Sequence, residues 1–570
     1  MTPPSVSQVL AWRPQLLNDV AREWEETAGR LQARTDIVDD SVTGTEGALA
    51  GSAADVSRAA IASTTAGLRR MCQALILAAA QARDAADVIG RGRDCVLAVV
   101  ADAGDEGCPV DDDGTVHPPS APSALLVACS GGSDSAARAM LEVRAAELTR
   151  VLQEALSALG GADAEAAGAI DTAFDAASPE PAPVRPSAAT GSPVGDWPHM
   201  SQDHIAASIA AMSEAERRRL IENKPAETGN TDGVPWGMRV AANRINIANA
   251  ILDERRHIDV PDDVKLRAAV SPTLEAADAE RLWATLHADP TMRDAAIEAH
   301  DHDARSRIAY YESLLADVPD PLDRERRVPR QILGFDPQRE SFIELSGDLG
   351  RAHAVAVLVP GLNTTFDGAA DDVDTARRFV AGSHGDVAMI TYLGGPFPTG
   401  QLAAGVADAA DPRYALRMAP RLVAFSEDVE RQAGTKPVTY LGHSYGGSIL
   451  GTAENFGLIA DRVIYVEAAG AGVGVHDSSD WHNRNPDVLR FSITAPGDPI
   501  SFVQGILLGP HGADPDQMPG VIALAPGRRL TGGPMGGLSS HSDVLNEPSD
   551  AWRNILAVIT GDREHIRVAG

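Results

Sequence analysis

The sequence predicts an α/β fold, with a mostly parallel sheet covered by helices, preceded by all-α helical regions. Two observations lead to this prediction. From about residue 330 onward, short apolar segments alternate with segments of helical periodicity, which is typical of parallel strands buried on both faces. Before that point, long alanine-rich segments repeat their apolar residues at helical spacing, and aromatic residues make up only 4% of the whole chain.

Changes in composition and in the spacing of apolar residues divide the chain into four predicted regions. Residues 1–177 are predicted to form an N-terminal helical bundle. Residues 178–198 are rich in proline and lack an apolar period, so we expect an extended linker there. Residues 199–328 are predicted to be a second helical region that packs on the α/β domain. The α/β domain itself is placed at residues 329–570.

The charge balance limits the partners that we expect. Lys and Arg number 49 and Asp and Glu number 80, which gives a formal net charge of −31. Such acidity argues against nucleic acid and against an anionic membrane surface as partners. No apolar run is long enough to span a bilayer, so no transmembrane segment is expected. The start of the chain lacks the pattern of a secretory signal, which favours a cytoplasmic location.

Cysteines do not predict a metal site. The four cysteines are Cys72, Cys95, Cys108 and Cys129, all in the N-terminal quarter, and their spacing matches no zinc-binding pattern. We expect buried or unreactive thiols, with one or two disulfides as the alternative if the protein is exported.

In the N-terminal region, apolar residues from Val9 to Trp24 recur at helical spacing, with Ser5 as the N-cap. Further helices are predicted at about 53–100 and 134–159, after a turn at 44–51. A helical hairpin of this size resembles the small W-x-G proteins associated with type VII secretion, with Leu49-Ala50-Gly51 in place of W-x-G. We therefore expect the bundle to pack within the chain, to bind a helical partner or to self-associate. Export by a type VII-like route stays open as an alternative.

One run in the second helical region combines residue types that bind metals. It is His300-Asp301-His302-Asp303. Adjacent residues on a helix point in different directions, so this run cannot easily close on one ion. We expect a solvated helix face here.

The α/β domain begins with two short segments, 331–335 and 341–345, that predict a β-hairpin joined at Asp336-Pro337-Gln338-Arg339. Further strands and helices alternate after it. The predicted strands are 353–359, 387–392, 438–441, 463–466, 488–494 and 521–524, and the predicted helices are 372–381, 413–432, 447–456 and 549–560.

The third of these strands, 438–441, leads directly into the sequence G-H-S-Y-G and then into a helix. This is the layout of a nucleophile elbow, in which a serine sits on a sharp strand-to-helix turn with its hydroxyl exposed. The turn brings backbone segments close together, so the flanking positions must be small, and here they are Gly442 and Gly446. The helix that follows directs its free N–H groups toward an anion formed near Ser444.

A serine on such an elbow needs a base and an acid, which follow it along the chain in the order Ser, Asp or Glu, His. Asp498 follows the predicted strand 488–494 in Pro-Gly-Asp-Pro, a stiff loop that suits an acid holding an imidazole in one orientation. His541 lies in a loop after the last strand and before the final helix, where the base is expected. His443 adjoins Ser444 but is predicted to point away from its hydroxyl.

An oxyanion hole in this arrangement takes one N–H from the residue after the nucleophile, here Tyr445. The second N–H comes from the loop after an early strand, where the sequence is Val-Pro-Gly-Leu-Asn-Thr-Thr. Either Leu362 or Asn363 can supply this amide.

Several separated segments resemble the actinobacterial α/β-hydrolase family known as α/β-hydrolase type 8, a domain of unknown function. The resemblance covers roughly residues 200 to 560. It implies an α/β-hydrolase fold with Ser444, Asp498 and His541 as the catalytic triad, and it implies little about substrate. The matching segments are N-K-P…T-G-N-T-D-G-V-P…R-V-A-A-N-R (223–244), L-G-F-D-P (333–337), V-P-G-L-N-T-T (359–365), G-H-S-Y-G-G (442–447), A-P-G-D-P-I (495–500) and residues 537–543.

Together these features predict a serine hydrolase that cleaves a carboxylic ester, an acyl or lipid ester, through an acyl-enzyme. No metal or organic cofactor is expected. Two alternatives remain. One is a secretion-associated or partner-binding helical protein whose hydrolase domain is catalytically idle. The other is an amidase or peptidase with the same triad.

Overall fold

The computed structural model describes residues 3–43, 52–123, 126–127, 130, 133–175, 193–270, 276–399, 411–502, 504, 510–546 and 548–569. The chain forms two compact units. The helical unit comprises residues 1–185 and 248–316, and the α/β unit comprises residues 186–247 and 317–570. The second predicted helical region, 199–328, is thus shared between both units. The boundaries proposed at residues 177 and 328 stay predictions.

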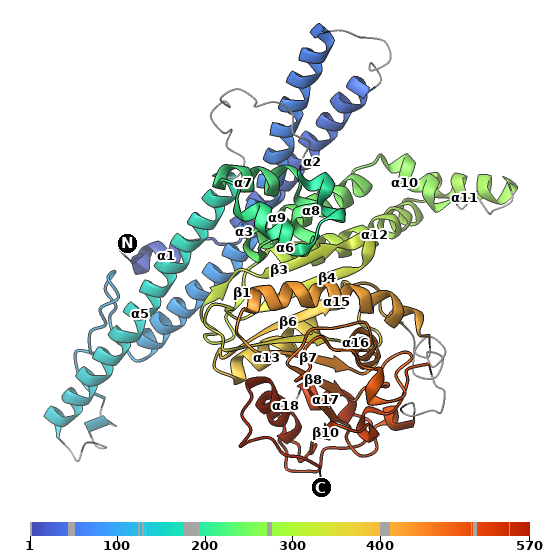
Figure 1. The fold of residues 1–570 in the computed structure, drawn as a ribbon. Helices are drawn as coiled ribbons and strands as arrows, with labels where there is room; N and C mark the ends of the chain where they lie inside the picture. The colour runs from blue at the N-terminus through green and yellow to red at the C-terminus, as the bar shows by residue number, and fades with distance from the viewer. Residues whose placement is uncertain are drawn as a thin grey trace. The chain divides into compact units, whose positions relative to one another are not determined.

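In the helical unit, the first helix is shorter than the sequence predicted. Ser5 caps it as expected, with its side chain accepting from the Gln8 N–H, but the helix ends at Ala11, with Trp12 as its C-cap. The following Pro14 has no N–H to continue the hydrogen-bond ladder. Longer helices succeed it, and the predicted turn at 44–51 lies outside the described residues. The helices are α1 (Val6–Ala11), α2 (Leu16–Thr43), α3 (Ser52–Asp105), α5 (Asp134–Asp175), α10 (Asp262–Ala269), α11 (Ala276–Ala288) and α12 (Pro290–Leu315), together with the end of α9 (Trp236–Ile258) (Figure 1).

A buried ion network joins four helices of this unit. Glu25 of α2 pairs with Arg83 of α3 and with Arg255 of α9. Glu312 of α12 lies 3.2 Å from Arg83, and burial, followed by the charge of Glu25, raises the pKa of its carboxyl to about 7. Because removing one member would leave a buried charge unpaired, the network holds these helices in register.

The run from His300 to Asp303 is only partly the solvated face that we expected. His302 and Asp303 are exposed. Asp301, in contrast, is fully buried and accepts a hydrogen bond from the buried Lys265 ammonium at 2.7 Å. The expectation is therefore wrong for Asp301, whose side chain leaves α12 on the face that packs against α10.

The α/β unit contains an eight-stranded sheet of order β10-β9-β8-β7-β5-β6-β4-β3. Strands β3 and β4 form the predicted antiparallel hairpin, β4 pairs antiparallel with β6, and all other neighbours are parallel. This confirms the mostly parallel sheet. The strands are β3 (Gln331–Asp336), β4 (Ser341–Ser346), β5 (Ala354–Val359), β6 (Val387–Leu393), β7 (Val438–His443), β8 (Arg462–Val466), β9 (Leu489–Ile493) and β10 (Val521–Ala523), and a separate ribbon pairs β1 (Val318–Pro319) with β2 (Arg327–Val328).

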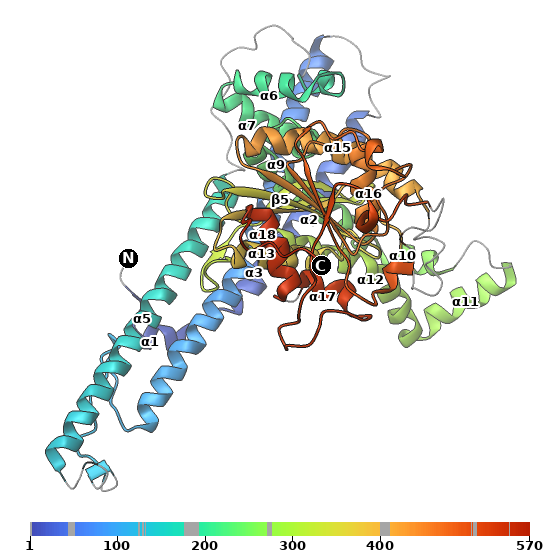
Figure 2. The same cartoon turned by 60° about the horizontal axis from the view of Figure 1, so that its bottom comes forward.

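Helices cover both faces of this sheet, as the near-continuous apolar strands predicted (Figure 2). On one face, α13 (Ala370–Gly382), α17 (Ser540–Asn546) and α18 (Asp550–Thr560) bury an apolar cluster in which the rings of Phe379 and Trp552 stack at 4.7 Å. On the other face lie α15 (Arg413–Ala433) and α16 (Tyr445–Asn455). Each predicted helix of this domain is present. Helix α17 was not predicted.

Short helices precede the sheet in this unit: η1 (Pro193–His199), α6 (Gln202–Ala210), α7 (Glu214–Asn223), α8 (Pro225–Asn230) and the start of α9. The segment 223–235 contains two glycines and two prolines, yet its first half is helical, because α8 occupies Pro225–Asn230. The side-chain amide of Asn230, at the end of α8, donates through Nδ2 to the Phe335 carbonyl and accepts through Oδ1 from the Phe335 N–H. These two hydrogen bonds tie α8 to β3.

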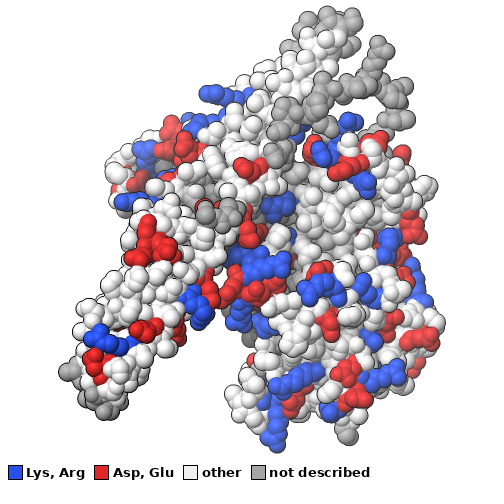
Figure 3. Space-filling model, turned by 90° about the vertical axis from the view of Figure 1, so that its left-hand side faces the viewer, with Lys and Arg blue, Asp and Glu red and all other residues white. Residues whose placement is uncertain are grey.

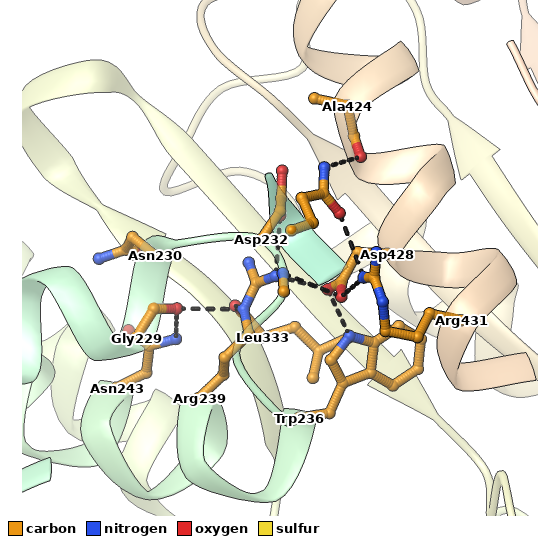
Figure 4. Close-up of polar contacts among 12 residues, drawn as sticks. Gly229, Asn230, Asp232, Trp236, Arg239, Asn243, Leu333, Ala424, Asp428 and Arg431 are labelled. Carbon is orange, nitrogen blue, oxygen red and sulfur yellow. Dashed lines mark hydrogen bonds and ion pairs between the residues drawn. The ribbon is translucent and has the colours of Figure 1, made fainter. Parts of the chain in front are cut away.

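A buried arginine connects these short helices to the sheet and to α15 (Figure 4). The Arg239 guanidinium donates to the Asp428 carboxylate at 3.0 Å and to the Leu333 carbonyl at 2.7 Å. The Trp236 indole and the Gly233 N–H also donate to Asp428, at 2.9 and 3.1 Å. Both charged side chains are almost fully buried, so these hydrogen bonds must replace the water that each charge loses on folding.

On the face of the molecule that Figure 3 shows, Lys and Arg side chains alternate with Asp and Glu side chains, so the surface charge there is mixed. None of the helices in the described ranges is long and apolar enough to cross a membrane.

We predict that Asp428→Ala lowers the free energy of unfolding of the α/β unit by about 3–5 kcal/mol. It removes the fully buried acceptor of the Arg239 guanidinium, the Trp236 indole and the Gly233 N–H, and leaves Arg239 only the half-buried Asp232 carboxylate, at 2.9 Å. The matched control is Glu214→Ala, which removes an exposed carboxylate from a weak ion pair and should cost at most about 1 kcal/mol. Urea unfolding followed by tryptophan fluorescence measures both. Equal effects of the two substitutions would contradict the role given to Asp428.

Candidate active site

Ser444 lies on a sharp turn between β7 and α16, as predicted. Its backbone has a φ of 54°, an unfavourable value for a residue with a side chain. Two hydrogen bonds fix this conformation: the Ser444 N–H donates to the Val466 carbonyl at 3.0 Å, and the Ser444 carbonyl accepts from the Ala469 N–H at 2.9 Å. The neighbouring strand β8 and the loop after it therefore hold the serine in place.

The small residues around the turn are required by close backbone packing. A Cβ atom on Gly446 would lie 2.1 Å from the Val359 carbonyl oxygen, and one on Gly442 would lie 2.7 Å from the Gly446 oxygen. Gly361 is also confined, because its Cβ would lie 2.7 Å from the Ser444 Cβ and 3.2 Å from the Ser444 hydroxyl oxygen. The loop after β5 thus passes directly beside the serine.

The structure brings Asp498 and His541 together, although 43 residues separate them. Asp498 follows β9 and is fully buried, and His541 lies in the first turn of α17. The Nδ1 atom of His541 lies 3.2 and 3.1 Å from the two carboxylate oxygens of Asp498. The acceptor-only carboxylate places the proton on Nδ1, which leaves Nε2 as the ring nitrogen able to accept a proton.

His443, immediately before the serine, contacts the same histidine. Its Nε2 atom donates to the His541 carbonyl at 2.6 Å, and the two rings lie 5.0 Å apart between centroids. Burial, followed by the charge of His541, lowers the pKa of His443 to about 4. His443 is therefore a neutral donor at neutral pH, and it links the elbow to the backbone of His541.

Two backbone amides beside the serine have no hydrogen-bond acceptor among the described residues. They are the N–H groups of Tyr445, at the start of α16, and of Leu362, in the loop after β5. The Asn363 N–H instead donates to the Pro398 carbonyl at 3.0 Å. Of the two candidates in this loop, Leu362 thus has the amide that is free to bind a ligand oxygen.

One buried carboxyl in this region was missed from the sequence. Glu467 follows the last residue of β8, and one of its carboxyl oxygens lies within 4.8 Å of ligand-type atoms of both Asp498 and His541. Within the described part of the chain, Glu467, Asp498 and His541 form the only group of three or more His, Cys, Asp or Glu residues whose side-chain ligand atoms lie this close together. A carboxylate directly after the strand next to the elbow strand is a signal that sequence inspection could have used.

We predict that Gly446→Ala destabilises the α/β unit strongly, because the added methyl group would overlap backbone oxygens that cannot move away. Gly533→Ala is the control, since a Cβ at that glycine meets nothing within 4 Å. Thermal unfolding should show a melting temperature lowered by several degrees for Gly446→Ala and nearly unchanged for Gly533→Ala. An unchanged melting temperature for Gly446→Ala would contradict the close packing of the turn.

Comparison with known proteins agrees with this architecture. Residues 336–504 match the model of a family described as Alpha/beta hydrolase, which confirms the resemblance drawn from the sequence motifs over this segment. Two uncharacterized proteins of Mycobacterium tuberculosis, from strains CDC 1551 / Oshkosh and H37Rv, are each 27% identical over 320 residues. The alignments cover 51% of this chain and 43% of each relative, so the chain matches less than half the length of these relatives. No solved structure matches the chain significantly. The family match over residues 336–504 and the eight-stranded sheet together show an α/β-hydrolase fold around Ser444.

Proposed function

We propose that this domain is a serine hydrolase that cleaves carboxylic esters through an acyl-enzyme. The observation that carries the proposal is the combination of Ser444 on a strained strand-to-helix turn with the His541–Asp498 pair, whose histidine is hydrogen-bonded to the residue before the serine. Three separate segments supply these groups, in the chain order that this fold requires.

In the first half of the reaction, the Ser444 hydroxyl oxygen attacks the ester carbonyl carbon while its proton passes to Nε2 of His541. Asp498 stabilises the imidazolium that forms, because its carboxylate accepts from Nδ1. The tetrahedral intermediate then expels the alcohol, which takes the proton from Nε2. The carbonyl carbon is left bonded to the serine oxygen.

In the second half, water attacks this acyl-enzyme, and His541 again takes the proton. Collapse of the second tetrahedral intermediate releases the carboxylic acid and returns the proton to Ser444. The negative charge on the carbonyl oxygen develops twice, once in each half. We assign its stabilisation to the amides of Tyr445 and Leu362, reinforced by the positive end of the α16 dipole.

Labelling with a fluorophosphonate probe tests the nucleophile. We expect wild-type protein to be labelled and Ser444→Ala to be unlabelled, because the probe forms its covalent bond with an activated serine hydroxyl. Ser479→Ala, which removes an exposed serine from η3 (Ser478–Asp480), should label like wild type. Labelling that persists in Ser444→Ala would contradict the assignment.

Hydrolysis of p-nitrophenyl esters of different acyl length tests the base and the acid. We expect His541→Ala and Asp498→Ala to lower kcat by about 10³-fold or more, since each removes a part of one proton-transfer unit. A parallel panel of p-nitroanilides distinguishes an esterase from an amidase. Turnover of the anilides at rates comparable to the esters would favour the amidase alternative.

A further inference from the structure

The carboxyl group of Glu467 has no part in the reaction described above, yet it lies beside the acid of the proposed triad. Both Glu467 and Asp498 are fully buried. A side-chain oxygen of each carboxyl group lies within 4.8 Å of one from the other, and a hydrogen bond between two carboxyl groups requires a proton on one of them. Two buried carboxylates in contact cannot both be ionised at a reasonable energetic cost.

The remaining contacts of Glu467 indicate which group carries this proton. Oε1 of Glu467 accepts from the Ala495 N–H at 3.0 Å, and Oε2 is buried with no hydrogen-bond partner among the described residues. Asp498 accepts from His541 Nδ1 and from the Ile500 N–H at 2.8 Å, contacts that favour its ionised form. The Oε2 atom of Glu467 is thus the free oxygen that can hold the proton.

We propose that Glu467 is a protonated positioning residue that donates a hydrogen bond to the Asp498 carboxylate and thereby orients the Asp498–His541 pair. The catalytic consequence of this inference rests on the proposed function. The presence of a proton shared by the two carboxyl groups does not rest on it. Through Ala495, the same side chain also fixes the turn that carries Asp498, because the Asp498 N–H donates to the Ala495 carbonyl.

The backbone conformation of Glu467 supports a positioning role for its side chain. Glu467 has a φ of 44°, in the left-handed region that non-glycine residues seldom adopt. Its N–H donates to the Ile493 carbonyl at 2.9 Å, which ties the end of β8 to the end of β9. Such strain persists only where surrounding contacts enforce it, and here those contacts direct the side chain toward Asp498.

The ionisable groups near Glu467 are Asp498 after β9, His541 in α17 and Asp516 in η5 (Pro515–Gln517). His443, at the end of β7, contacts His541. Burial, followed by the charge of Asp498, raises the pKa of the Glu467 carboxyl from its ordinary value near 4.5 to about 9, and Asp516 adds to this rise. His443, with a pKa of about 4, is neutral throughout that range.

The sign of the effect on stability follows from this rise. Between about pH 4.5 and pH 9, Glu467 is ionised in the unfolded chain and protonated in the folded one, so folding takes up a proton. Its contribution to stability is fully present at the acidic end and is lost as the pH rises toward 9. Glu467→Gln keeps the acceptor for Ala495 and the donor for Asp498 but cannot ionise.

The test compares wild type, Glu467→Gln and Glu467→Ala in the full chain. Melting temperatures are measured from pH 5 to pH 9.5, together with rates of fluorophosphonate labelling and of p-nitrophenyl ester hydrolysis. We expect the melting temperature of Glu467→Gln relative to wild type to rise with pH. We expect wild-type kcat to fall above about pH 9 while that of Glu467→Gln does not, and Glu467→Ala to lower kcat about tenfold or more at pH 7.

Glu454→Gln is the matched control, because the buried Glu454 carboxylate pairs with Arg490 at 2.8 Å instead of with another acid. This variant should lose stability at every pH in the range. If Glu467→Gln instead loses stability like the control, or retains the alkaline fall in kcat, the shared proton is ruled out, even if Glu467→Ala does not fold. Absence of labelling in wild type would refute the proposed function alone, since the melting temperatures still decide whether Glu467 is protonated.

Discussion

Close packing of backbone against backbone at the Ser444 turn is the constraint on which the rest of the site depends. Gly446 leaves no room for a Cβ atom against the Val359 carbonyl, and Gly361 leaves none against the serine itself. The loop after β5 is therefore pressed against the start of α16, and the free amides of Leu362 and Tyr445 belong to these two segments. A single steric requirement thus fixes the nucleophile and the two amides proposed for the oxyanion hole.

A second set of contacts connects the Ser444 turn to the proposed base, His541, and to the proposed acid, Asp498. Strand β8 holds the Ser444 backbone through Val466, and the next residue, Glu467, reaches across to the turn that carries Asp498. His443 reaches in the other direction, to the backbone of His541. His443, before the serine, and Glu467, after β8, thus connect the Ser444 turn to His541 and to the turn that carries Asp498. Backbone contacts therefore hold the site as much as its reacting side chains do.

Much of this arrangement follows from local sequence. Apolar runs separated by helical segments predicted the sheet, and strand ends marked Ser444 and Asp498, because parallel strands place their carboxyl ends on one edge. His541 was marked by its position after the last strand and before the final helix. Features that depend on tertiary contacts were not predictable in this way. The role of Glu467 comes from its burial beside a second acid, Asp301 is buried because Lys265 lies opposite it, and α17 is too short to show a period. The catalytic roles themselves stay predictions until the reaction is measured.

Trapping the acyl-enzyme tests the central claim most directly. The full chain is mixed with a p-nitrophenyl ester, quenched in acid within the first turnovers, digested and examined by mass spectrometry. With an ester whose acyl-enzyme hydrolyses more slowly than it forms, we predict an acyl group on the peptide that contains Ser444, formed with a burst of about one p-nitrophenol per active site, because p-nitrophenol leaves before water attacks. Steady ester turnover with no acylated peptide, or an acyl group attached to another residue, would contradict it.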